Sequence, residues 1–207
     1  MNKYYVTVFA FLTCSCLRAQ EFPRFTGDIS GGFTQPVGRT GANLNEGWNV
    51  EGGFGVNFVP WVGAKIDVGY NRMNLNSSAL ASIGVPNGDV QIFSATLDPI
   101  IHLNPKGHVD FYLVGGGGLY HWYQEFTQPS VATVDAFNPF FGFYPVNIPT
   151  TQILGSYSVN KPGANGGVGI ALGTKFHGKL FAEARYTRIF FSPGHADYIP
   201  VSFGFRW

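Results

Sequence analysis

From about residue 24 onward, apolar and polar residues alternate with a period of two. In residues 61–73, one set of positions holds Val62, Ala64, Ile66, Val68 and Tyr70, and the set between them holds Gly63, Lys65, Asp67, Gly69 and Asn71. Successive side chains of a β-strand point to opposite faces of its sheet, so this period predicts strands with one apolar face. Eight such segments are expected, at about 24–35, 47–58, 61–73, 89–102, 109–123, 162–175, 180–191 and 198–207.

The connections between these segments alternate in length. Short connections are expected at 59–60, 104–108 and 176–179, and longer ones at 36–46, 74–88, 124–161 and 192–197. Short turns on one side and long loops on the other are typical of outer-membrane barrels, whose tilted strands need about 9–11 residues to cross the bilayer. The pattern therefore predicts an all-β fold, a closed eight-stranded antiparallel up-and-down transmembrane β-barrel.

Charged residues decide which face of the strands meets lipid. A lysine or arginine facing lipid near the midplane costs about 2–4 kcal/mol, so the charged positions are expected to face the lumen and the apolar positions the lipid. An eight-stranded lumen is just wide enough for side chains to fill, which predicts a lumen plugged by paired charges. The expected lumen charges are Asp28, Glu51, Lys65, Asp67, Asp98, Lys175, Glu183, Arg185 and Arg206.

The first nineteen residues have the layout of a secretory signal peptide. Met1-Asn2-Lys3 is a short positive start, residues 4–17 are mostly apolar, and Ala19 is a small residue at the expected cleavage point. This stretch is too short to span a bilayer as a stable helix. A lipoprotein signal at Cys14 is disfavoured, because the preceding Phe11-Leu12-Thr13 is not a small-residue lipobox. Residues 1–19 are thus expected to be removed, leaving 20–207 as one barrel domain.

Composition narrows the class of protein further. The chain has 28 glycines among 207 residues, 45% hydrophobic residues, 12% charged residues and a net charge of +1. The hydrophobic content argues against disorder, and the near-neutral charge gives no basic surface for nucleic acid. The five histidines have no metal-ligand spacing, and no cofactor motif is present, so neither a metal nor a cofactor is expected.

The end of the chain alternates without interruption and stops on an aromatic residue. Its outward positions are expected to be Ile199, Val201, Phe203, Phe205 and Trp207. This ending resembles the C-terminal signal by which the barrel assembly machinery recognises bacterial outer-membrane proteins. Together with the eight segments, it makes the chain from residue 20 onward resemble the small OmpA/OmpX-type outer-membrane barrel family. Within that family, Tyr198–Trp207 and Gly115–Gly118 resemble the single-domain outer membrane protein beta-barrel group. The resemblance implies the bacterial outer membrane, with its lipid and the assembly machinery as partners.

Aromatic residues near the predicted strand ends are expected to form interfacial girdles. One girdle would lie at the rim of the long loops and the other at the rim of the short turns. The expected members are Trp48, Tyr70, Trp122 and Tyr123 for the first and Phe58, Trp61, Phe176 and Trp207 for the second.

The long third loop, residues 124–161, exceeds the ~12–15 residues beyond which loops are usually functional or disordered. It carries an aromatic cluster of Phe137, Phe140, Phe141, Phe143 and Tyr144. One interpretation is an exposed apolar patch that meets an unidentified extracellular partner, a lipid or a surface. The other, which we favour from the sequence, is a loop that folds back over the barrel mouth and buries these rings.

Two motifs suggest chemistry but have a structural explanation. Gly115–Gly118 could be a phosphate-binding loop, but it lies inside a predicted strand rather than between a strand and a helix. Ser192, His195 and Asp197 are the one nearby Ser/His/Asp set, but they fall in a short loop without a firm scaffold. No catalytic residue is therefore expected.

The sequence favours a non-catalytic outer-membrane barrel with a charge-plugged lumen and exposed loops, serving in envelope structure, adhesion or interaction. Three alternatives remain open. They are a narrow channel for ions or small solutes, a lipid A-modifying enzyme, and a soluble lipocalin-like carrier, which would need apolar residues inside the barrel.

Overall fold

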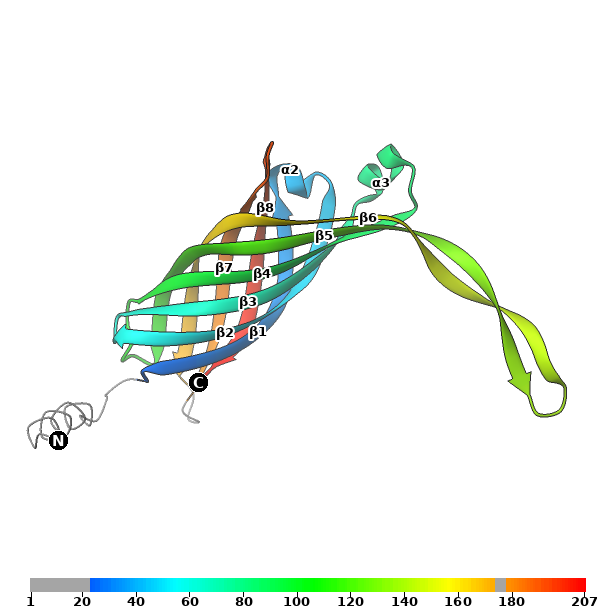
Figure 1. The fold of residues 1–207 in the computed structure, drawn as a ribbon. Coiled ribbons are helices and arrows are strands. Elements are labelled where there is room, and N and C mark those ends of the chain that lie inside the picture. Colours follow the sequence, from blue (N-terminus) through cyan, green and yellow to red (C-terminus); the bar gives the residue numbers. More distant parts are fainter. Residues whose placement is uncertain (1–22, 174–177) are drawn as a thin grey trace, which may run out of the picture.

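A computed structural model of the chain describes residues 23–173 and 178–207. The expected signal peptide therefore lies outside the described residues, as do Lys175 and Phe176. The elements run from one end of the barrel to the other and back (Figure 1). They are β1 (Phe25–Val37), α2 (Gly38–Gly41), β2 (Leu44–Val59), β3 (Val62–Leu75), α3 (Ser77–Ile83), β4 (Asn87–His102), β5 (Val109–Asn138), β6 (Gly142–Gly173), β7 (Lys179–Phe190) and β8 (His195–Arg206).

The eight strands form a closed antiparallel barrel in chain order. Each strand pairs with the next one along the chain, and β1 pairs with β8 from Asp28↔Arg206 to Val37↔Asp197, which closes the ring. The eight-stranded up-and-down barrel predicted from the alternation is confirmed. Closure gives every strand two neighbours, so the barrel wall has no free edge within the bilayer.

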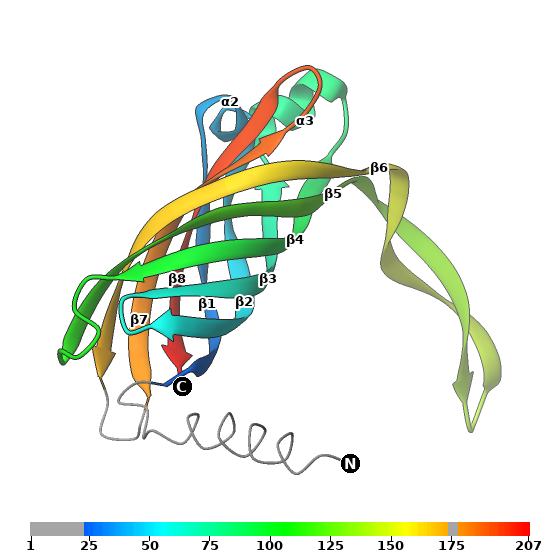
Figure 2. The same cartoon turned by 60° about the vertical axis from the view of Figure 1, so that its left-hand side comes forward.

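The two ends of the barrel differ. The turn end carries the β2–β3 and β4–β5 connections together with the C-terminus, and the hairpin end carries α2, α3 and the distal part of β5 and β6 (Figures 1 and 2). Asn76 caps α3 by accepting a hydrogen bond from the Ala79 N–H at 2.8 Å, and Gly84 ends it in the left-handed conformation. No helix among residues 23–173 and 178–207 is long and apolar enough to cross a membrane.

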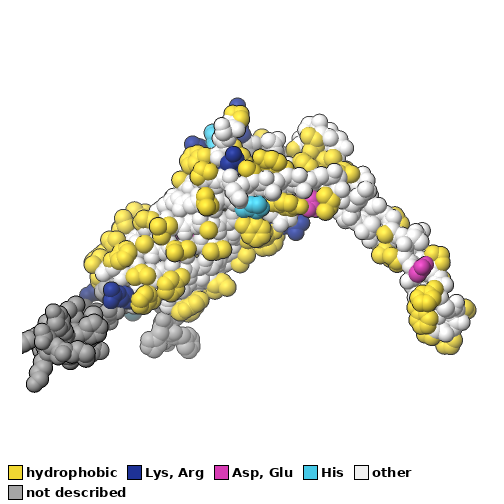
Figure 3. Space-filling model, in the orientation of Figure 1, with side chains coloured by type: hydrophobic (Ala, Val, Ile, Leu, Met, Phe, Trp, Pro, Cys, Tyr) yellow, Lys and Arg dark blue, Asp and Glu magenta, His cyan; other side chains and the backbone are white. Residues whose placement is uncertain are grey.

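The alternation along the strands separates an apolar outer face from a lumen that contains the charges. In β3, Ile66 and Val68 are 57% and 61% exposed on the outer face, whereas Lys65 and Asp67 are buried in the lumen. The space-filling view shows apolar side chains spread over the barrel wall and lysine and arginine gathered near its ends (Figure 3). The orientation predicted from the cost of lipid-facing cations is therefore the one that the barrel adopts.

The lumen at the hairpin end is apolar, which the sequence reasoning missed. Trp122 was expected in a lipid-facing girdle, but it is buried and packs edge-on against Phe191, with ring centroids 5.5 Å apart. Adjacent residues of a strand point to opposite faces, so Trp122 and Tyr123 cannot share one girdle. Trp122 belongs to a buried lumen cluster with Leu44, Met73, Leu75, Val90, Ile92, Tyr120, Ile189, Ala196 and Tyr198.

Residues 124–161 are not an irregular loop. Strands β5 and β6 stay paired from Val109↔Leu172 to Asn138↔Gly142, with one register shift near Phe126, so three residues connect them at the tip. The length of the segment between the predicted strands suggested a loop, but the β-branched residues of Val131–Val134 and Thr150–Thr151 favour strand. The result is a β-hairpin that projects well beyond the barrel (Figures 1 and 2).

Candidate functional site

The centre of the lumen is organised around Arg185 of β7. Its guanidinium donates from Nη1 to Asp98 Oδ2 at 2.9 Å and from Nη2 to Asp67 Oδ2 at 2.8 Å. Nη2 also lies 3.1 Å from Glu51 Oε1, and Nε donates to Glu183. One buried cation thus contacts four carboxylates from β2, β3, β4 and β7, and it crosslinks opposite walls of the barrel.

Two further cations continue these contacts toward the turn end. Lys65 Nζ lies 3.1 Å from Asp67 Oδ2 and 3.5 Å from Asp28 Oδ2. Arg206 Nε lies 3.4 Å from the same Asp28 oxygen, so Asp28 joins β1, β3 and β8. Shared carboxylates thus connect all three cations into one lumen ion cluster.

The lumen ion cluster contains eight of the nine charged residues that the alternation assigned to the lumen. They are Asp28, Glu51, Lys65, Asp67, Asp98, Glu183, Arg185 and Arg206. The ninth, Lys175, lies outside the described residues. Neutral partners were not anticipated: Thr96 Oγ1 and Asn165 Nδ2 donate to Asp98 at 2.7 and 2.9 Å. Arg206 also stacks over the rings of Tyr112 and Phe181, at 4.8 and 4.9 Å from their centroids.

Lumen glycines make the space that these long side chains occupy. A Cβ added at Gly53 would lie 2.2 Å from Asp67 Oδ1 and 2.8 Å from Asp28 Oδ1. One added at Gly169 of β6 would lie 2.2 Å from Cζ of the buried Tyr112 ring. Any larger residue at these two positions would displace either a carboxylate or the ring on which Arg206 stacks.

We expect Gly169→Ala to destabilise the barrel by about 1–3 kcal/mol, the usual effect of overpacking a filled interior. Gly166→Ala is the matched control, because it lies in the same strand but nothing stands within 4 Å of its added Cβ. Urea titration of both variants folded in lipid vesicles measures the difference. Equal stability of the two variants would contradict the tight packing of the lumen.

The space left in the middle of the lumen is very small. A void of about 20 Å³ lies among Glu51, Asp67, Tyr120, Arg185 and Tyr198. A water molecule needs roughly 10–15 Å³ of such volume, so this void has room for about one. The apolar lumen cluster lies between this void and the hairpin end, where a cavity of about 400 Å³ lined by Leu44, Leu75, Val90 and Trp122 opens.

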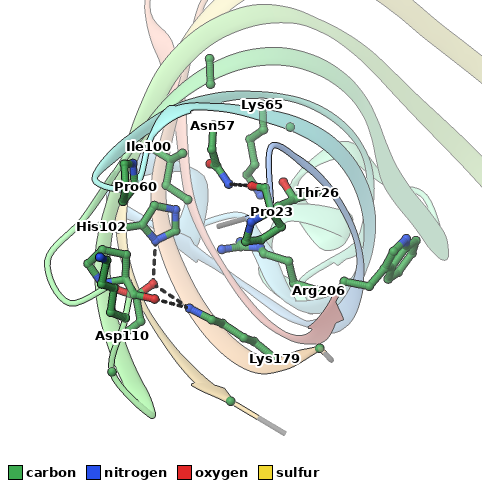
Figure 4. A pocket seen from close by; sticks show the side chains of 18 residues that line it. Pro23, Thr26, Asn57, Pro60, Lys65, Ile100, His102, Asp110, Lys179 and Arg206 are labelled. Carbon is green, nitrogen blue, oxygen red and sulfur yellow. Dashed lines mark hydrogen bonds and ion pairs between the residues drawn. The ribbon is translucent and has the colours of Figure 1, made fainter. Parts of the chain in front are cut away.

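A larger cavity of about 610 Å³ opens at the turn end (Figure 4). Pro23, Lys65 and Arg206 are among the residues that line it. His102, Asp110 and Lys179 form a second ionisable group in its wall. There, Asp110 accepts a hydrogen bond from His102 Nδ1 at 2.7 Å and lies 3.4 Å from Lys179 Nζ.

The sequence reasoning did not single out Asp110 or His102. Asp110 shares its face of β5 with Tyr112 and Val114, and the same alternation would have assigned it to the lumen.

The Ser192–His195–Asp197 set does not form a triad in the structure. His195 Nε2 lies 3.4 Å from Asp197 Oδ2, but both carboxylate oxygens of Asp197 accept hydrogen bonds from Arg188, at 2.8 and 2.9 Å. Gly115–Gly118 lies within β5, as its neighbours predicted. Within residues 23–173 and 178–207, no group of three or more His, Cys, Asp or Glu side chains could hold a metal ion.

The aromatic cluster lies exposed at the hairpin tip. Phe137, Phe143, Phe141 and Phe140 are 65%, 75%, 84% and 89% exposed, and Tyr144 is 44% exposed. The Phe137 and Phe143 rings contact each other across the two strands, with centroids 5.2 Å apart. The expectation that this segment folds over the barrel mouth and buries its rings is wrong, because continuous pairing carries the tip away from the barrel.

The C-terminal strand presents its alternating apolar residues outward. Phe203 and Trp207 are more than half exposed, and Phe205 stacks on Trp207 with ring centroids 6.3 Å apart. Ile199 and Val201 belong to the same outer face. Recognition of this strand by the barrel assembly machinery stays a prediction.

The family model described as the outer membrane protein beta-barrel domain matches residues 6–206. No curated protein matches the chain.

Solved structures with the same architecture include two outer-membrane proteins. Neisserial surface protein A is similar with a TM-score of 0.56 at 14% identity, covering 89% of this chain and 96% of that one. A major outer membrane protein of Thermus thermophilus is similar with a TM-score of 0.57 at 12% identity, covering 88% of this chain and 97% of that one. At such low identity these likenesses establish the fold alone.

Proposed function

The chain belongs to the outer membrane protein beta-barrel family and lies in the bacterial outer membrane, and we propose that it is a non-catalytic barrel that acts through its β5–β6 hairpin. The barrel would be the anchor, with its lumen closed by ion pairs. The hairpin would be the interacting part, in a role of adhesion or envelope structure. The observation that carries the proposal is the joint presence of a filled lumen and an exposed aromatic tip.

The filled lumen favours an anchor over a channel. A solute would have to pass Arg185, which is held by four carboxylates, and then the apolar lumen cluster around Trp122 and Tyr198. Opening such a path requires breaking buried ion pairs, and removing one partner of a buried pair typically destabilises a protein by about 3–5 kcal/mol. A steady conductance through the native protein would favour the channel instead.

The absence of catalysis is supported by the geometry of the best candidate site. A nucleophile needs a base within hydrogen-bond reach, and the base needs a third group that orients it. Here Asp197, which would orient His195, is instead bound on both oxygens by Arg188. Incubation of the folded protein with lipid A tests this part: an unchanged lipid mass is expected, and a mass change would reject it.

The hairpin is proposed as the interacting part because its tip exposes several large apolar side chains together. Isolated exposed apolar residues are ordinary, whereas contiguous apolar patches usually mark an interaction site. A photo-crosslinking benzophenone residue at Phe141, compared with the same residue at Ser156 nearer the barrel, tests this in living cells. We expect adducts to form from position 141 and not from position 156. An absence of adducts at 141, whether with protein or with lipid, would overturn the proposal.

Removing the distal hairpin should leave the barrel intact. Gln128 pairs with Gln152, so deleting residues 128–152 and joining Thr127 to Ile153 through an Asn-Gly turn preserves the register of the remaining strands. We expect the truncated protein to keep a heat-dependent mobility shift on SDS gels, because β5 still pairs with β4 up to Thr127. Loss of the shift would mean that the hairpin is needed for folding rather than for interaction.

The C-terminal strand, with its outward Phe203, Phe205 and Trp207, is the proposed contact with the barrel assembly machinery. Its position as the closing strand, paired with both β1 and β7, supports this assignment. The lipid of the outer membrane would be the partner of the remaining outer face.

A further inference from the structure

The distal hairpin is a two-stranded ribbon with no neighbour on either edge. The pairing of β4 with β5 reaches only to Asn87↔Thr127, and that of β6 with β7 only to Gly163↔Ile189. Beyond these points both faces of the ribbon are exposed, including apolar side chains such as Val131 and Ile153. An isolated two-stranded hairpin is marginally stable in water, so this ribbon needs a surface to lie on.

The few charged residues of the ribbon and the prolines along its edges restrict the kind of surface that it can bind. Residues 128–160 contain one charged side chain, Asp135, which gives no complementarity to a charged partner. The ribbon also carries Pro129 on β5 and Pro145 and Pro149 on β6. Proline has no N–H to donate, and it is a common device against strand addition at a free edge. A second copy pairing edge to edge is therefore disfavoured, and the apolar faces and tip are left as the binding surface.

The outward alternation of the barrel wall extends along β5 to the aromatic tip, with Glu125 and Asp135 at positions of the same parity in between. Phe137 shares its alternation along β5 with Leu113 and Leu119, which are exposed on the outer wall of the barrel. Its cross-strand partner is Phe143, and the two rings are in contact. Phe140 and Phe141 stand beside this pair at the turn, so four phenylalanines lie together at the tip (Figure 3).

The course of the hairpin selects which membrane the tip would meet. In both ribbon views it leaves the hairpin end of the barrel and then bends away from α2 and α3, so that its tip lies beside the barrel (Figures 1 and 2). A hairpin that reached toward another cell would instead continue straight in the direction in which it leaves the barrel. The bend brings the apolar tip back to the level of the barrel wall, whose outer face is the lipid face.

We propose that the β5–β6 hairpin is a membrane-docking arm whose four tip phenylalanines insert among the acyl chains of the same membrane that holds the barrel. The inference rests on the proposed function, because it names the partner of the hairpin. Phenylalanine transfers favourably from water to an apolar environment, and four neighbouring rings would hold the arm down without any charge.

A fluorophore at the tip tests the arm directly. Cys14 and Cys16 are the only cysteines, so a chain with both replaced by serine accepts a single label at Phe141→Cys, or at Ser156→Cys as the control. The label is an NBD dye, and the protein sits in a phosphatidylcholine nanodisc with nitroxide-labelled acyl chains. We expect a blue-shifted emission and a loss of most of the signal by quenching at 141, and neither effect at 156. A water-like, unquenched emission at 141 would overturn the proposal.

Two further experiments distinguish this proposal from docking on another membrane and from docking that does not depend on the rings. In a nanodisc without nitroxide lipid, adding nitroxide-labelled vesicles should leave the label at 141 unquenched, and quenching there would mean docking on a different membrane and overturn the assignment. With the label at Ala136→Cys, the double variant Phe140→Ser and Phe141→Ser should abolish quenching, and retained quenching would refute the role of the rings. In the photo-crosslinking experiment at Phe141, adducts with protein and none with lipid would refute membrane docking by the hairpin. They would leave the proposed function, an interaction through the hairpin, standing.

Discussion

Replacing Arg185 by methionine should destabilise the folded barrel by about 3–5 kcal/mol, because it leaves four buried carboxylates without their shared cation. The methionine keeps much of the side-chain volume, so the loss reports the ion pairs rather than a cavity. The measurement is the free energy of unfolding from urea titration in lipid vesicles. Loss of the heat-dependent gel shift would mean that the variant no longer folds, an extreme case of the same destabilisation.

Two companion variants make this prediction specific. Arg188→Met removes an arginine from the same strand, but one that is partly exposed and bound to Asp197 at the rim, and it should have a far smaller effect. Adding Glu183→Gln and Asp98→Asn to Arg185→Met should restore part of the lost stability, because fewer unpaired charges remain. Equal losses from Arg185→Met and Arg188→Met would show that the lumen ion cluster does not hold the barrel together.

A lysine in place of Val68 should destabilise the barrel by about 2–4 kcal/mol, the usual effect of a lipid-facing cation at the bilayer midplane. Val68 lies midway along β3, is 61% exposed on the outer face, and pairs with Gly52 and Ala95. The control is Ser156→Lys, on the part of the hairpin outside the barrel wall. It should leave the stability of the barrel nearly unchanged. If Val68→Lys were as stable as the control, the outer face would not be the lipid face.

The lumen residues could be predicted from sequence because successive side chains of a strand alternate between the two faces of the sheet. Once one residue is assigned to the lumen, the faces of the others in that strand follow. Lys65, Asp67 and Arg185 were placed inside by that rule and by the cost of exposing a cation to lipid. Their contacts could not be predicted in the same way. Arg185 meets Asp98 across the lumen, from β7 to β4, and such pairs depend on the tilt and stagger of the strands, which no local pattern encodes.

The errors have equally physical origins. Trp122 was assigned to a girdle from its position along the chain, although its alternation with Tyr120 places it inside. Asp110 was overlooked because it stands one residue after the start of a predicted strand, where the alternation is weakest. The hairpin was interpreted as a loop because it lies between two segments of clear alternation, whereas cross-strand pairing extends almost to the tip.

The aromatic residues at the tip illustrate a limit of a different kind. Their clustering was visible in the sequence, and an exposed patch was one of two interpretations. Choosing between burial and exposure required the register of β5 against β6, which carries the rings away from the barrel mouth. A local pattern can therefore identify an unusual apolar segment without fixing what surrounds it.

The central claim is that the lumen is closed by the lumen ion cluster and the apolar residues beyond it. Single-molecule conductance in a planar bilayer tests it most directly, with protein whose folding has been verified by its heat-dependent gel shift. We predict no steady conductance from the native barrel, because the space between Arg185 and Tyr198 holds about one water molecule. A stable open level that changes when Glu183 or Arg185 is neutralised would contradict the closed lumen and identify the protein as a channel.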